Sequence, residues 1–82
     1  MILENIVKQA SNMLKNENVI SHELDSQIIL SDIMRVTKEF LITNDQINIS
    51  EKIRKKYDCA IQRRISKEPV AYIIGMKEFW SQ

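Results

Sequence analysis

The sequence predicts an all-α fold, a small bundle of four to five helices followed by an extended C-terminal segment. Apolar residues recur at helical spacing over most of the chain, which is the primary signal for amphipathic helices. The length of 82 residues allows one small domain. One Gly, one Pro and 28% charged residues lack the compositional marks of collagen, linkers or disorder. The 44% apolar content is enough to offset the conformational entropy lost on folding.

Residues 2–16 form the first expected helix. At about 100° per residue, its apolar positions fall within an arc of about 140°. Polar side chains fill the opposite arc, which is typical of a surface helix with one face on a core. The apolar positions are Ile2, Leu3, Ile6, Val7, Ala10, Met13 and Leu14.

The second helix is expected from residue 22 to about residue 36, and it is interpreted as the central one. Ser21 precedes it as a capping hydroxyl, and two acids stand in its first turn, where they meet unpaired amides and the positive end of the helix dipole. Its apolar residues cover a wide arc. The acids on or near it are interpreted as an ordinary solvated face, not as an acid–base pair: Glu23, Asp25 and Asp32.

A short helical turn is expected over residues 38–42, with Thr37 as its cap. The polar residues 43–46 then break it. Ile47 and Ile49 alternate with a polar residue, but three residues are too few to predict a strand. We therefore expect a loop whose two isoleucines plug one end of the bundle.

The last long helix is expected over residues 51–66, capped by Ser50. A short apolar helix should follow from Pro69 to Ile74, because proline is tolerated at the first helical position. Gly75 can then supply the left-handed residue that closes it. Residues 77–80 are expected to be extended. The apolar face of the long helix carries Ile53, Tyr57, Ala60, Ile61 and Ile65.

The last long helix also holds most of the positive charge. Residues 51–68 have seven Lys and Arg against three acids, a net charge of +4, whereas the other 64 residues have a net charge of −3. Four cations fall within about 60° on the helical wheel, in a stripe about 22 Å long. Such a stripe is either a solvated helix face or a surface for phosphates or an acidic partner. The four cations are Lys52, Lys56, Arg63 and Lys67.

Other classes of site have little support in the sequence. His22 is the only histidine and Cys59 the only cysteine, which excludes a His/Cys zinc cluster and an internal disulfide. We interpret His22 as a surface or capping residue and Cys59 as a packed or idle thiol, in a reducing, cytoplasmic setting.

The longest apolar run, Val70–Ile74, is far shorter than the roughly 20 residues that cross a bilayer. The single glycine excludes a glycine-rich phosphate loop. The residues alone indicate a non-catalytic helical module without a metal site.

One C-terminal motif is specific enough to carry an identification. Glu68-Pro69-Val70-Ala71-Tyr72-Ile73, Gly75 and Glu78-Phe79-Trp80-Ser81 closely resemble a segment of the HemK/PrmC-like release-factor glutamine methyltransferases. Upstream, Leu24–Leu30 resembles the leucine-aspartate helix of that family, and Arg63-Arg64 before the motif is also similar. The resemblance covers most of the chain.

The resemblance implies the N-terminal domain of a longer enzyme. Such an enzyme uses S-adenosylmethionine to methylate the glutamine of the Gly-Gly-Gln motif in class 1 peptide-chain release factors. The family's cofactor loop and its Asn-Pro-Pro-Tyr motif lie further along the chain, so no catalytic or cofactor-binding residue is expected here. Residues 1–75 are expected to be the substrate-recognition domain. Residues 76–82 are expected to begin the linker or β-hairpin to an absent catalytic domain.

Two contact surfaces are predicted, and two other readings stay open. The stripe Lys52, Lys56, Arg63 and Lys67 is expected to contact an acidic region of the release factor, whereas Tyr72, Phe79 and Trp80 are expected to pack against the catalytic domain. One other reading is a free-standing helical adapter that binds RNA or an acidic protein through helix 51–67. RNA is not favoured, because the only aromatic residue of that helix lies on its apolar face. The other is an oligomerisation domain that dimerises through Phe79 and Trp80.

Overall fold

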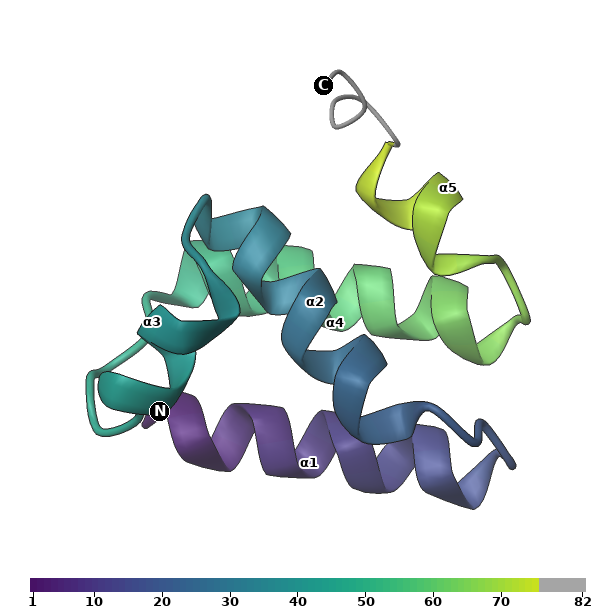
Figure 1. Cartoon of the computed structure of the whole chain (residues 1–82), viewed down its shortest axis with the longest axis horizontal. Coiled ribbons are helices and arrows are strands. Elements are labelled where there is room, and N and C mark those ends of the chain that lie inside the picture. Colours follow the sequence, from purple (N-terminus) through teal and green to yellow (C-terminus); the bar gives the residue numbers. More distant parts are fainter. Residues whose placement is uncertain (76–82) are drawn as a thin grey trace.

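The computed structural model describes residues 1–75, and these form five α-helices (Figure 1). Helices α1, α2 and α4 contact one another, with α2 crossing the other two. The short helix α3 lies near the N-terminus of α1, and α5 packs on α2 and α4. This confirms the predicted all-α bundle. The helices are α1 (Leu3–Asn16), α2 (His22–Met34), α3 (Lys38–Thr43), α4 (Glu51–Ile65) and α5 (Val70–Ile74).

The core is shared among the three long helices. The apolar faces predicted for residues 2–16 and 51–66 supply most of it, because residues three and four apart return to the same side of a helix. Met13 is an exception, since its side chain is 40% exposed at the edge of this face. The buried apolar side chains are Leu3, Ile6, Ala10, Leu14, Val19, Ile29, Leu30, Leu41, Ile49, Tyr57, Ala60 and Ile61.

The segment before α4 closes against the start of α1. The backbone N–H of Leu3 donates to the Ile47 carbonyl at 2.9 Å, and the N–H of Ile49 donates to the Met1 carbonyl at 2.9 Å. An isolated antiparallel bridge joins Ile2 to Asn48. The Leu3 bond satisfies an amide at the N-terminus of α1 that has no partner inside the helix. The expectation of two plugging isoleucines was half right, because Ile49 is buried whereas Ile47 is 37% exposed.

Two of the three predicted caps are confirmed. The Thr37 hydroxyl accepts from the Phe40 N–H at 3.0 Å, and the Ser50 hydroxyl accepts from the Ile53 N–H at 3.2 Å. The prediction for Ser21 was wrong, because its hydroxyl makes no cap bond and donates instead to the Asp25 carboxylate at 2.9 Å. The second helix also ends at Met34, two residues before the predicted end, because Arg35 adopts a left-handed conformation with φ 60°.

The last described helix, α5, begins and ends as predicted to within one residue. Pro69 is its N-cap, and Gly75 has φ 89°, the left-handed conformation that closes the helix. The predicted extended residues 77–80 and the predicted linker 76–82 lie outside the described residues. Among residues 1–75, every helix is too short or too polar to cross a membrane.

Candidate functional site

The predicted basic stripe begins on the outer surface of α4. Lys52 and Lys56 are both exposed there, one helical turn apart. Neither side chain takes part in an ion pair within residues 1–75. Their two charges are therefore available to an external partner.

The far end of the stripe differs from the prediction. Lys67 lies beyond the end of α4 and has φ 74°, so the chain turns away from the helix axis before reaching it. This turn lets the Lys67 and Glu68 amides donate to the last α4 carbonyls, those of Arg64 and Arg63, at 2.9 and 3.2 Å. The Lys67 Nζ then donates to the Glu17 carbonyl, at the end of α1, at 2.8 Å. The helical wheel misplaced Lys67, because it assumes that the helix continues beyond Ile65.

Arg63 is engaged inside the domain. Its Nε donates to Glu68 Oε1 at 3.0 Å, and its Nη2 pairs with Oε2, which makes a two-pronged contact. This hydrogen bonding holds the pKa of Glu68 below its usual value and raises the pKa of Arg63. Lys52 and Lys56 are thus exposed to solvent. Arg63 and Lys67 instead bond within the domain, where α4 turns toward α5.

A buried ion pair lies beside this turn, and the sequence analysis missed it. Asp25 is 5% exposed, and its Oδ2 accepts from Arg64 Nε at 2.9 Å. Arg64 Nη1 also donates to the Glu68 carbonyl at 3.4 Å. The interpretation of Asp25 as part of a solvated face was therefore wrong. A charge leaves water only where a partner compensates it, and that partner lies 39 positions along the chain.

Tyr72, the first of the predicted interdomain residues, lies on the outer side of α5. Its side chain is 65% exposed, and no residue of α5 is fully buried. Val70 and Ile73 pack partly against the core. Tyr72 therefore presents an aromatic ring to solvent at the point where the described chain ends. Phe79 and Trp80, its predicted companions, lie outside the described residues.

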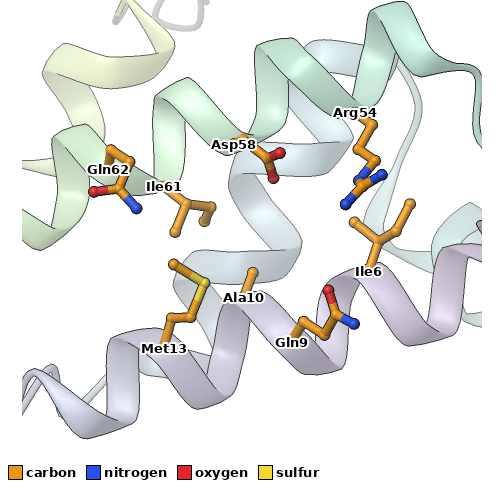
Figure 2. A pocket seen from close by; sticks show the side chains of 8 residues that line it. All are labelled: Ile6, Gln9, Ala10, Met13, Arg54, Asp58, Ile61 and Gln62. Carbon is orange, nitrogen blue, oxygen red and sulfur yellow. The ribbon is translucent and has the colours of Figure 1, made fainter.

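Between α1 and α4 the surface is hollowed into an open groove of about 300 Å³ (Figure 2). Side chains from the two helices face each other across it, and the lining combines apolar groups, two amides and one ion of each sign. Sequence analysis missed this groove, because a helical wheel shows one helix and not the seam between two. The lining residues are Ile6, Gln9, Ala10, Met13, Arg54, Asp58, Ile61 and Gln62.

The remaining reactive side chains differ in their surroundings. His22 Nδ1 lies 2.8 Å from the Ser11 hydroxyl, and Cys59 is exposed, so this thiol is not packed. Tyr57 is buried and donates to the Ser26 carbonyl at 2.9 Å. Burial raises the pKa of its phenol, which keeps the group protonated. Residues 1–75 contain no group of three potential metal ligands.

Comparison with known proteins places this chain in a family. The model of the PrmC N-terminal domain matches residues 5–75. A release factor glutamine methyltransferase of Clostridium botulinum is 32% identical over 96% of this chain and 28% of its own length. One from Buchnera aphidicola subsp. Baizongia pistaciae is 36% identical over 99% of this chain and 29% of its own length.

A bifunctional methyltransferase of Rickettsia felis is also similar, with 30% identity over 98% of this chain and 15% of its own length. The chain thus spans less than a third of the curated relatives described here. No solved structure matches it significantly. From the family match over residues 5–75 and these relatives, we conclude that the chain belongs to the PrmC N-terminal domain family.

Proposed function

We propose that this chain is the substrate-recognition domain of an S-adenosylmethionine-dependent release factor glutamine methyltransferase. The substrate would be the glutamine of the Gly-Gly-Gln motif in class 1 release factors, in the cytoplasm. The observation that carries the proposal is the family match over residues 5–75, together with relatives of that name. Because the chain covers 28% of the Clostridium relative, methyl transfer is assigned to polypeptide outside the matched region.

The described residues do not fit an S-adenosylmethionine site. Glycine-rich nucleotide loops join a strand to a helix N-terminus. Here the only glycine, Gly75, follows a five-residue helix as its C-cap. Residues 1–75 form one isolated bridge and no strand. The proposal therefore leaves the cofactor and the reacting groups to the catalytic domain.

Recognition at a distance can still accelerate the reaction. Binding energy from a surface remote from the reacting amide can hold that amide in place and so lower the entropic part of the barrier. We infer that Lys52 and Lys56 contact an acidic region of the release factor, because both are exposed and neither forms an ion pair with another of the residues 1–75. Arg63 and Lys67 are weaker candidates for the same contact, since both already bond within the domain.

Charge reversal in the full-length enzyme tests this contact. We expect Lys52→Glu/Lys56→Glu to raise the KM for the release factor by about tenfold, with kcat little changed and the effect shrinking as salt increases. The matched control is Lys15→Glu/Lys38→Glu, which reverses two exposed lysines on α1 and α3 that take part in no ion pair within residues 1–75. Equal KM values for the two double variants would reject the contact.

A free-standing adapter that binds RNA or an acidic protein is the second candidate function. It shares the two exposed lysines, but the aromatic ring of α4, Tyr57, is 1% exposed and cannot stack on a base. Strong, salt-dependent RNA binding by this chain would favour the adapter.

A further inference from the structure

We propose that Arg64 is a positioning residue that fixes the direction in which α5 leaves the bundle. The inference rests on the proposed function, because it concerns how this domain and the release factor it holds are oriented toward the catalytic domain. Arg64 touches no substrate in this account. It acts through the residues between α4 and α5.

One guanidinium connects three parts of the fold. Arg64 belongs to α4, its Nε binds Asp25 of α2 at 2.9 Å, and its Nη1 reaches the Glu68 carbonyl of the connecting segment at 3.4 Å. The Asp25 side chain is only 7% exposed and that of Arg64 20% exposed. The planar guanidinium carries donors in fixed directions, so it can hold both acceptors at once.

Glu68 is consequently held at three points. Its N–H donates to the Arg63 carbonyl at 3.2 Å, its carboxylate pairs with the Arg63 side chain, and its carbonyl accepts from Arg64. Pro69 comes next, with φ −61°, which its ring restricts. The Tyr72 and Ile73 amides then donate to the Pro69 carbonyl at 3.0 and 3.2 Å and start α5. Little free rotation is left between the end of α4 and α5.

Apolar packing alone would not set this direction firmly. No side chain of α5 is fully buried, although Val70 and Ile73 pack partly against the core. A five-residue helix with so little burial depends on its connection for orientation. We therefore assign the orientation of α5 to the polar contacts at Glu68, with the buried Asp25–Arg64 pair as their anchor.

The test compares two substrates in the full-length enzyme: the intact release factor and a short Gly-Gly-Gln peptide. The peptide is too small to contact both domains. Arg64→Lys keeps a positive charge opposite Asp25, but its single nitrogen cannot also hold the Glu68 carbonyl. The matched control is Arg54→Lys, on the same helix but without a contact to Glu68.

We expect Arg64→Lys to lower kcat/KM for the intact release factor by about tenfold, mainly through KM, and to leave the peptide reaction unchanged. The Arg54→Lys control should leave both reactions unchanged.

A parallel fall for both substrates would indicate loss of folded enzyme and overturn the proposal, as would no change for either substrate. If Arg64→Lys does not fold, Asp25→Asn decides in the same way, because it removes the charge that anchors the Arg64 guanidinium and leaves Glu68 unchanged. Failure of the proposed function itself would look different: the unmodified enzyme would transfer no methyl group to a release factor, or would methylate it equally well without residues 1–75.

Discussion

Asp25 and Arg64 show how one pair of side chains can join helices that are distant in sequence. The Asp25 carboxylate also accepts from the Ser21 hydroxyl at 2.9 Å, so two donors compensate for the water that it loses. Such a pair contributes little net free energy, because desolvation opposes the Coulomb attraction. Its effect is geometric, since an unpaired buried carboxylate would be costly. We therefore expect the pair to disfavour any packing of α2 against α4 that separates Asp25 from Arg64.

Glu68 makes one contribution that depends on pH. Hydrogen bonding from Arg63 holds the pKa of Glu68 below its usual value in the folded chain. The resulting stabilisation is present above the unfolded pKa of about 4.3 and is lost as the pH falls through the lower folded pKa. We predict that wild type is more stable than Glu68→Gln at neutral pH and that this difference vanishes in acid. Urea midpoints at about pH 7 and about pH 3 measure it.

The effect should be small, because solvent screens a pair whose side chains are 48% and 32% exposed. A difference between the two proteins that is equal at both pH values would contradict the assignment of Arg63 as the partner of Glu68.

The sequence predicted the two exposed lysines of α4 but not the buried Asp25–Arg64 pair. Lys52 and Lys56 lie within a regular helix, where a wheel locates them correctly. Asp25 and Arg64 meet only after two helices pack, so no local pattern distinguishes Asp25 from a solvated acid. The chain leaves α4 at Lys67, which is itself left-handed although it is not a glycine. Sequence spacing does not show such a turn.

At the scale of elements, helix caps are the clearest local signals. The Ser50 hydroxyl accepts from the Ile53 amide at the start of α4. We predict that Ser50→Ala lowers the free energy of unfolding by about 1 kcal/mol, because it leaves a helix amide without its partner. Urea denaturation of the chain measures this change. Ser50→Asp is the control, since aspartate is an equally good cap. Equal losses for alanine and aspartate would show that the cap bond contributes nothing.

The elements differ in how far sequence alone predicts them. The amphipathic helices α1 and α4 match their expected ranges to within one residue at each end. The end of α2 does not, because the apolar pattern continues to Val36 while the backbone reverses at Arg35. Residues 47–49 form a loop, as predicted, but their pairing with the start of α1 was not foreseen, because that partner is more than 40 positions away.

At the scale of the molecule, the parts of the domain differ in how firmly they are held. The helices α1, α2 and α4 share a core in which Leu14 and Leu30 are completely buried. The helix α5 lies at the edge, held by the polar contacts at Glu68 and exposing Tyr72. Under the proposed function, α1, α2 and α4 carry the recognition surface, and α5 orients it toward the catalytic domain.

The most direct test of the central claim removes this domain from the full-length enzyme. Deletion of residues 1–75 should lower kcat/KM for the intact release factor by about 100-fold, because the remote binding surface is lost. Methylation of a short Gly-Gly-Gln peptide should continue at the wild-type rate. Unchanged methylation of the intact release factor by the truncated enzyme would contradict the claim that this domain recognises the substrate.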